Sequence, residues 1–415
     1  MKAGWQTKKL GELCEIELGK TPARANNSFW DERRETGNVW LSIADLLKAE
    51  DNFVVDSKEY VSDKGAAICK LVPQGTLLVS FKLTLGRLAF AGRDLFTNEA
   101  IAALSIFNER ELSKEFLFYF LHFFDWVKAA ENDVKLKGMT LNKAKLKEML
   151  VYFPSPSEQQ RIVGILDAAF DGIATAKANA EQNLQNARAL FESHLQSVFT
   201  QRGEEWVEKP LSAVCDLQNG YAFKSGDYIE SSSTLNIRMS SIRPGGSFDS
   251  EHNQRFLPDS YAKEYASFLL KEGDLIIAMT DMAGDPKILG VPTLVSNLNG
   301  RNFLMNQRVG KLFGFSDNVR VPYLRYFLAS PLIKGYYKSK GAGGLQINIS
   351  KGDILSAQIP IPGIAKQDRI VDQLDELSEE TQRLESLYQR KLAALDELKK
   401  SLLHRAFNGQ LTIDN

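Results

Sequence analysis

Carboxylates close to a lysine are the residues of this sequence that come nearest to a catalytic pattern. The run from Glu272 to Asp274 carries two of them, and Gly284-Asp285-Pro286-Lys287 resembles a nuclease motif superficially. The glycine and proline in these runs are instead typical of turns. We therefore predict no catalytic role for either run.

Other catalytic and metal-binding patterns are missing from the sequence. It has no GxxxxGK[ST] phosphate loop, no GxGxxG after a strand, no HExxH, no GxSxG and no NPPY-type methyltransferase motif. The histidines lack metal-ligand spacing; they are His122, His194, His252 and His404. Cys14, Cys69 and Cys215 form no CxxC pair, so neither a disulfide framework nor a zinc site is predicted. We expect a binding protein without a catalytic residue, a metal or a cofactor of its own.

Basic residues gather around glycines in both halves of the chain. Five lysines between Lys135 and Lys147 surround Gly138-Met139-Thr140, and lysines between Lys334 and Lys351 surround residues 341–344, with no acid between them. Lysine neutralises phosphate, and Gln or Asn can pair with base edges. The net charge of −1 does not exclude this, because the local charge distribution decides binding.

These clusters, with polar residues at other turns, form the predicted DNA-binding set. In the N-terminal half the set is Lys20, Thr21, Arg24, Lys82, Arg87, Lys135, Lys137, Thr140, Asn142 and Lys143. In the C-terminal half it is Tyr221, Phe223, Lys224, Ser240, Ser241, Arg243, Arg301, Gln307, Arg308, Tyr336, Lys338, Lys340, Gln346 and Asn348.

An internal repeat positions these residues. Trp5, Leu10, Cys14 and Gly19 each have an identical residue 201 positions later, at Trp206, Leu211, Cys215 and Gly220. A repeat of this length is far longer than a solenoid unit and indicates a duplicated domain. The sequence of each copy predicts a mixture of strands and helices. The loops of the two copies differ in length, and variable loops on a fixed frame usually carry binding specificity.

A long helical pattern follows each copy. The two patterns cover residues 154–199 and 360–407, and a constant offset of 208 holds from Arg161 and Arg369 to Phe199 and Phe407, so we expect two helices of equal length. Their apolar residues alternate in steps of three and four, which indicates a coiled-coil seam. The first seam is rich in alanine and the second in leucine, so we expect the helices to pair within the chain; a homodimer through either helix is the alternative.

The bulk composition is that of a globular protein. The chain has 415 residues, 44% hydrophobic and 25% charged. It shows no run of about 18 apolar residues and no apolar core of a signal peptide, so neither a membrane span nor secretion is predicted. We expect a cytoplasmic protein.

The repeated helix entry resembles that of a known family. Pro154-Ser155-Pro156 followed by Glu158-Gln159-Gln160-Arg161-Ile162-Val163, doubled around two divergent domains, is similar to the specificity subunit of type I restriction–modification systems. The second entry, Lys366-Gln367-Asp368-Arg369, departs from that pattern by one residue.

The resemblance implies an architecture and a set of partners. Residues 1–153 and 203–359 would be target-recognition domains, residues 154–202 and 360–409 antiparallel spacer helices, and residues 410–415 a tail. The fold would be α+β with a pseudo-twofold repeat. Each domain would read one part of a split duplex DNA site. Two methyltransferase subunits, which carry S-adenosylmethionine, would dock on the chain, and restriction subunits would join them in a phage-defence complex.

A rigid helix pair leads to a hypothesis about spacing. It would fix the distance between two DNA readers, so that the half-sites must lie at a matching separation. Three other readings stay open: a self-contained methyltransferase or nuclease, a coiled-coil scaffold without a DNA role, and a specificity subunit whose partner fuses methylation and cleavage.

Overall fold

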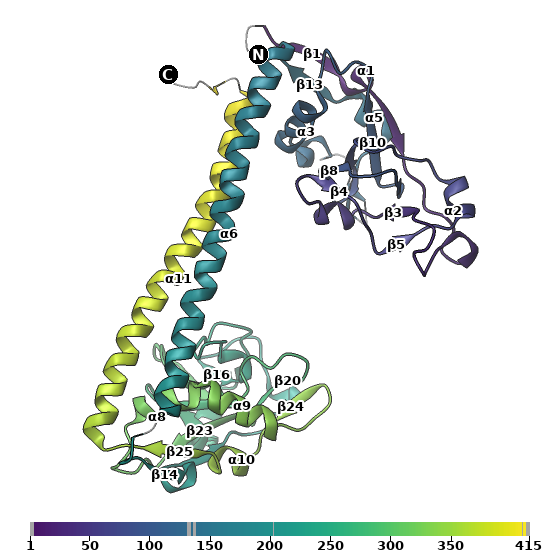
Figure 1. Ribbon diagram of the computed structural model, residues 1–415. Coiled ribbons are helices and arrows are strands. Elements are labelled where there is room, and N and C mark those ends of the chain that lie inside the picture. The colour runs from purple at the N-terminus through teal and green to yellow at the C-terminus, as the bar shows by residue number, and fades with distance from the viewer. Residues whose placement is uncertain (1–3, 131–133, 136–137, 202, 409, 412–415) are drawn as a thin grey trace. The chain divides into compact units, whose positions relative to one another are not determined.

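The chain forms two compact units, Met1–Ala180 with Arg390–Asn415, and Glu181–Gln389. The computed structural model describes residues 4–130, 134–135, 138–201, 203–408 and 410–411, and of these the side chains of residues 134–135 and 138–140 are not described. Each unit contains one mixed α/β domain and half of each long helix (Figure 1). The expected combination of two mixed domains with long helices is confirmed. Within the described residues, no helix is both long and apolar enough for a membrane span.

The central sheet of the first unit has five strands in the order β2-β10-β6-β8-β4. Their bounds are Cys14–Leu18, Ile101–Ile106, Leu77–Ser80, Leu88–Ala91 and Phe53–Val54. Successive residues of β6 enter two cores: Leu77 and Val79 pack with helix α3 (Lys114–Phe123), whereas Leu78 packs on the opposite face. The two-residue period of a strand buries both faces, which explains why β6 is continuously apolar.

Smaller sheets and short helices complete the first unit. The sheets are β5-β3-β9 (Glu59–Tyr60, Val39–Leu41, Phe96–Thr97), β11-β12-β7 (Val134–Lys135, Gly138–Thr140, Lys82–Leu83) and β1-β13 (Gln6–Lys9, Leu150–Phe153). The helices are α1 (Leu10–Leu13), α2 (Asp63–Ile68), α4 (Trp126–Ala129) and α5 (Lys143–Glu148).

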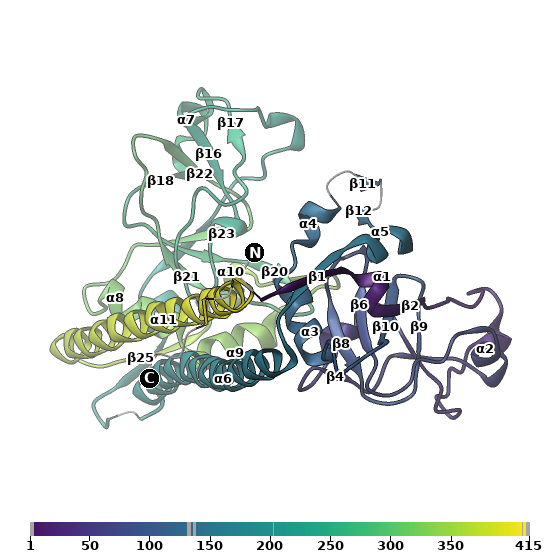
Figure 2. The ribbon, with the colours of Figure 1, turned by 90° about the horizontal axis from the view of Figure 1, so that it is seen from above.

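The second unit repeats this plan. Its central sheet has the order β15-β23-β19-β21 (Asp216–Asn219, Val309–Phe313, Leu275–Ala278, Pro292–Leu294). A second sheet has the order β17-β16-β22-β18 (Phe256–Leu257, Thr234–Ile237, Asn302–Met305, Leu269–Leu270), and Figure 2 shows its labels grouped together within this unit. The remaining strands pair as β20-β24 (Thr280–Met282, Gln346–Asn348) and β14-β25 (Val207–Pro210, Gln358–Ile361). The helices are α7 (Tyr261–Glu264), α8 (Val321–Ala329), α9 (Pro331–Lys340) and α10 (Lys351–Leu355).

The long helices are α6 (Pro156–Thr200, 45 residues) and α11 (Ile364–Phe407, 44 residues). In the first unit Lys177 pairs with Asp396, and Phe170 lies under the ammonium group of Lys399, 4.7 Å from it. As residue numbers rise along α6, those of the α11 partners fall, so the two segments are antiparallel.

The second unit shows the same antiparallel contact. Arg188 of α6 pairs with Glu385 of α11 at 3.0 Å, while Leu195 and Phe199 share a core with Ile370 and Leu374. The helices therefore contact each other within the chain in each unit. Coiled-coil packing along the whole seam stays a prediction.

A buried glutamine fixes the start of each long helix. The side-chain amide N–H groups of Gln159 donate to the carbonyls of Glu111 and Pro154 at 2.8 and 2.9 Å, and its Oε1 accepts from the backbone N–H of Ser113 at 2.9 Å. These bonds satisfy backbone groups that a buried helix entry would otherwise leave unpaired. They explain why glutamine stands in the repeated entry motif.

Candidate nucleic-acid interface

A hollow of about 680 Å³ in the second unit gathers polar and basic side chains. It lies where β16 and β22 end and the antiparallel strand β17 begins, so residues that are distant in sequence line one surface. The lining residues are Phe223, Ser225, Tyr228, Ile229, Glu230, Arg238, Met239, Gln254, Arg255, Phe256, Asn306, Gln307 and Arg308. Three of these, Phe223, Gln307 and Arg308, belong to the predicted DNA-binding set.

Three guanidinium groups give this hollow its charge. Arg238 and Arg308 are half-buried and Arg255 is exposed, and none of them has an ion pair within the part of the chain that the structure describes. Glu230 is the one acid in the lining. Arginine at an open surface without a carboxylate partner is suited to bind phosphate or the acceptor edge of a base.

An aromatic cluster borders the hollow. Phe223 stacks on Tyr261 and meets Tyr265 edge to face, with ring centroids 6.1 and 5.2 Å apart, and the ring of Tyr221 lies 4.6 Å from that of Tyr265. The hydrogen bond with Tyr221, followed by burial, raises the pKa of Tyr265 well above its ordinary value. These rings form a packed wall, and Tyr221 remains 38% exposed at its edge. The cluster can hold a loop in place and offer one ring for stacking.

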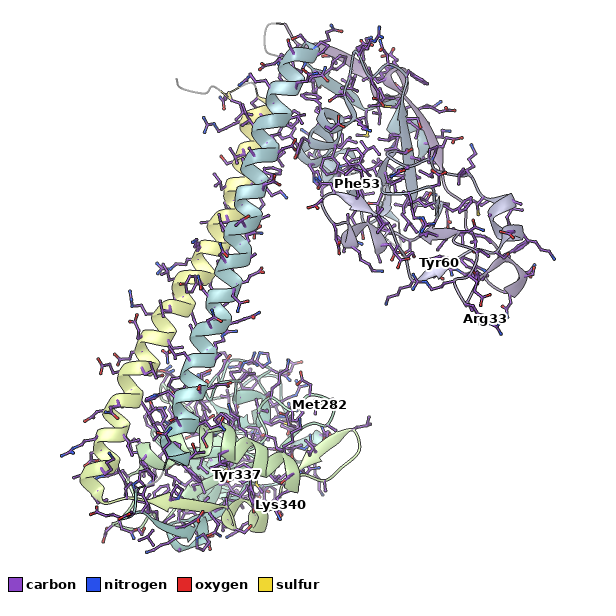
Figure 3. All side chains as sticks on the ribbon, viewed as in Figure 1. Arg33, Phe53, Tyr60, Met282, Tyr337 and Lys340 are labelled. Carbon is purple, nitrogen blue, oxygen red and sulfur yellow. The ribbon has the colours of Figure 1, made fainter. Side chains whose placement is uncertain are left out.

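In the corresponding region of the first unit, the arginine is already bound by side chains of the same domain. Arg24 lies 4.2 Å above the ring of Trp30 and 4.8 Å above that of Trp40, and it donates two hydrogen bonds to Glu59. Arg24, Trp30 and Glu59 line a hollow of about 360 Å³ together with Tyr60, which Figure 3 labels, and with two further acids, Asp31 and Glu32. Arg24 is therefore held by an intramolecular carboxylate and two rings.

The other predicted residues of the first unit are spread over separate contacts. Thr21 donates to Glu99, Arg87 donates to the carbonyl of Ile43 at 3.2 Å, and the ammonium of Lys82 lies 5.2 Å from the ring of Phe81. Lys20 is exposed directly after β2.

The lysine-rich loop of the first unit is described in part. Asn142 caps α5 by accepting from the backbone N–H of Lys145 at 2.9 Å, and Lys143 is exposed at the first position of that helix. Lys137 lies outside the described residues, as do the side chains of Lys135 and Thr140.

The glycine-rich loop of the second unit joins α9 to β24. Lys338 and Lys340 are exposed at the end of α9, and Lys340 lies 5.7 Å from the ring of Tyr336. Figure 3 shows Lys340 and Met282 in this unit. Gln346 is half-exposed on β24, and the Oδ1 of Asn348 accepts from the Thr280 hydroxyl at 2.7 Å. The five predicted residues of this loop region do not line the 680 Å³ hollow; they are Tyr336, Lys338, Lys340, Gln346 and Asn348.

The remaining predicted residues of the second unit do not line the hollow either. Arg301 pairs with Glu251 at 2.6 Å, Ser241 is buried in a short turn, and Arg243 closes a turn through its backbone N–H. Lys224 is exposed and Ser240 is half-buried.

Sequence reasoning missed Arg238, Gln254 and Arg255. Arg255 faces Asn236 across the β16–β17 pair, where the backbone N–H of Asn236 donates to its carbonyl at 2.9 Å. Strand pairing brings it to the hollow, and its neighbours along the chain carry no motif. Comparison of the strand registers of the two repeats is the signal that would have found it.

No group of three or more metal-binding side chains comes together within the described ranges.

The family model of the type I restriction modification DNA specificity domain matches residues 2–186 and 203–392. The chain belongs to this family.

Several proteins of this specificity-domain family are similar to the chain. A Methanocaldococcus jannaschii protein, the type I restriction enzyme MjaIX specificity subunit, is 23% identical over 66% of this chain and 65% of its own length. The Escherichia coli EcoKI specificity subunit is 27% identical over 63% and 58%. The Escherichia coli EcoBI specificity subunit is 21% identical over 91% and 81%. The chain thus spans less than two thirds of the first two of these relatives.

Two solved structures show the same fold. One comes from work on complex assembly and conformational transition of the type I R-M system; it matches with a TM-score of 0.76, 19% identity and 99% coverage of both chains. The other is the HsdS subunit from Thermoanaerobacter tengcongensis, with a TM-score of 0.54, 17% identity and coverage of 99% and 98%. The likeness extends over nearly the whole chain, including both domains and both long helices.

Proposed function

We propose that this chain is the DNA-specificity subunit of a type I restriction–modification complex. The chain belongs to the family of the type I restriction modification DNA specificity domain. The single observation that best supports the proposal is the hollow lined by Arg238, Arg255 and Arg308. Three guanidinium groups without a carboxylate partner in the described structure match the phosphates and base acceptors of duplex DNA. Each domain would bind one half of a bipartite site.

The proposed division of the chain follows its repeat. Residues 1–153 and 203–359 are the two recognition domains, residues 154–202 and 360–409 are the spacer segments, and residues 410–415 are the tail. Our proposal gives the domains contact with DNA and gives the spacer segments the task of fixing the half-site separation. The exposed acids of α11, among them Asp372, Glu376 and Glu379, disfavour DNA there, because they would repel phosphate.

The proposed partners supply the chemistry. Two methyltransferase subunits with S-adenosylmethionine dock on this chain and restriction subunits join them, while the chain itself has no catalytic role. A specificity subunit of a related system, whose partner fuses methylation and cleavage, is the second candidate. The type of partner encoded beside this gene distinguishes the two.

The test combines the chain with the methyltransferase encoded beside its gene. We expect the complex to bind one duplex sequence selectively, with affinity that falls steeply as salt rises. The chain alone, given S-adenosylmethionine or Mg²⁺ with DNA, should neither methylate nor cleave. A complex that assembles but binds all duplexes equally would overturn the recognition role, and activity of the chain alone would overturn the non-catalytic role.

A further inference from the structure

The two domains share one frame around an equivalent asparagine. Asn98 follows β9, which runs parallel to β3, and Asn306 follows β22, which runs parallel to β16. Each asparagine accepts a hydrogen bond through Oδ1 from the backbone N–H two residues later, at 3.0 and 3.2 Å. Ala100 and Arg308 supply those N–H groups, and the carbonyls of these two residues accept from Phe81 and Met279. Ala100 of the first domain therefore corresponds structurally to Arg308 of the second.

Strand register identifies a second equivalent pair. In β3, Trp40 lies opposite Glu59; in β16, Asn236 donates its backbone N–H to the carbonyl of Arg255. Trp40 and Asn236 each pair on their other side with the residue two places before the shared asparagine. Glu59 and Arg255 thus occupy the same place in the two frames.

The side chains at these places have changed their hydrogen-bonding character. Glu99 of the first domain corresponds to Gln307 of the second, Ala100 corresponds to Arg308, and Glu59 corresponds to Arg255. The first domain therefore presents the carboxylates of Glu99 and Glu59 where the second presents the amide of Gln307 and the guanidinium of Arg255, and the guanidinium of Arg308 stands where the first domain has the methyl group of Ala100. The backbone frame is the same, so the exchange alters the surface chemistry without altering the support.

Glu99 and Arg308 occupy adjacent positions of the shared frame and have opposite hydrogen-bonding chemistries. Burial raises the pKa of Glu99, but hydrogen bonds from the Thr21 hydroxyl and from a backbone N–H outweigh it, so that the pKa is held below its ordinary value. Glu99 is therefore ionised at neutral pH and can only accept hydrogen bonds. Arg308 can only donate, in a fork that fits O6 and N7 of guanine, whereas a carboxylate accepts from the amino group of cytosine.

We infer that these two adjacent positions of the shared frame determine base specificity: Arg308, beside Gln307, reads a guanine in the half-site of the second domain, and Glu99 reads an amino-bearing base, cytosine by the usual pairing, in the half-site of the first. This inference rests on the proposed function and deepens it. Arg308 is half-buried against the frame, which suits a base contact, whereas the exposed Arg255 suits a phosphate.

The experiment uses the full chain in complex with its methyltransferase. Methylation mapping in the host first gives the wild-type target, and duplexes with each target position changed in turn are then the probes. Arg308→Ala should lower discrimination at one guanine of one half-site by about 5- to 150-fold, the range that a bidentate contact gives. Discrimination in the other half-site should be unchanged. Arg308→Lys should restore part of it, and Lys263→Ala, which removes an exposed charge outside the hollow, should leave it intact.

Two outcomes would overturn the inference. One is unchanged guanine discrimination in Arg308→Ala. The other is a uniform loss over all duplexes with a smaller salt slope, which is the signature of a phosphate contact and is what we expect of Arg255→Ala. If the wild-type complex shows no sequence preference at all, the proposed function fails, and that result is recognised before any variant is made.

Discussion

Gln159 and Gln367 make three equivalent hydrogen bonds, one glutamine near the start of each long helix. As Gln159 bonds to residues 111, 113 and 154, Gln367 donates to the carbonyls of Asn318 and Pro362 at 2.9 and 2.8 Å and accepts from the backbone N–H of Arg320 at 2.8 Å. Both side chains are fully buried. Each amide thereby joins a long helix to the loop before α3 or α8, a helix that shares a hydrophobic core with it.

Replacing Gln159 with alanine should destabilise the first unit. The change leaves two buried carbonyls and one N–H without their partner, so we expect a loss of about 3 kcal/mol, since each unsatisfied group costs roughly 1–3 kcal/mol and water can reach part of the space. The melting temperature should fall by roughly 6–12 °C. Thermal unfolding followed by circular dichroism measures it. The neighbouring Gln160 is exposed, and Gln160→Ala is the matched control, expected to change stability by less than about 0.5 kcal/mol. Equal effects of the two variants would contradict this role for Gln159.

Tyr326 should make stability depend on pH above 10. Burial, together with the hydrogen bond that its hydroxyl donates to Asp375, raises the pKa of Tyr326 to about 12. The unfolded chain loses this proton near pH 10, while the folded chain keeps it. The resulting stabilisation is therefore complete below pH 10 and is lost as pH rises to about 12. Urea unfolding at pH 9 to 11.5 measures the slope, which should be shallower in Tyr326→Phe. An identical slope in that variant would refute the assignment. The equivalent pair, Tyr119 and Asp167, should act the same way in the first unit.

The ion pair between Arg188 and Glu385 should contribute modestly. Its arginine side chain is 53% exposed, and pairs of that kind are worth about 0–1 kcal/mol. Arg188→Glu places two acids together, and we expect a loss of about 1 kcal/mol that shrinks in high salt. Adding Glu385→Arg should restore the lost stability. A double-mutant cycle in urea gives the coupling energy, and a coupling of zero would show that this contact does not hold α6 to α11.

The spacing hypothesis can be tested by lengthening the helices. One heptad inserted into α6, with a matched heptad in α11 to keep the ion pairs in register, adds about 10.5 Å. We expect the non-specific gap of the recognised DNA site to grow by about three base pairs, at 3.4 Å each. Methylation mapping of the variant complex reads the gap directly. If the complex assembles and the gap is unchanged, the helices do not set the spacing.

The fold was predictable where the sequence repeats. The constant offset of 201 that starts at Trp5 and Trp206 reveals a duplicated domain, and the constant offset of 208 that includes Arg161 and Arg369 reveals two equal helices, without any long-range contact information. The alanine and leucine seams also indicated the helix contacts, because seam residues such as Ala180 and Leu374 are buried.

The candidate site was predictable only in part. Gln307 and Arg308 were found because they are a polar and a basic residue next to each other at an expected turn, but Arg255 reaches the hollow through strand pairing, which no local pattern encodes. Arg24 and Arg301 were basic residues near turns, yet each is paired with a glutamate far away in sequence. A list of cations cannot distinguish a charge that is already neutralised from one that is free to meet a ligand.

The first unit is assembled from the two ends of the chain, and this sets when it can be completed during protein synthesis. Phe407 packs on Phe116 and Phe120, and Arg161 donates to the carbonyl of Leu411 at 2.9 Å. Residues 1–180 must wait for residue 390 and those beyond it. At ribosomal speeds of about 5–20 residues per second, that delay is on the order of 10–40 s. A nascent N-terminal domain would meanwhile expose part of its core, so a premature stop codon near the end of the gene would damage the domain that was translated first.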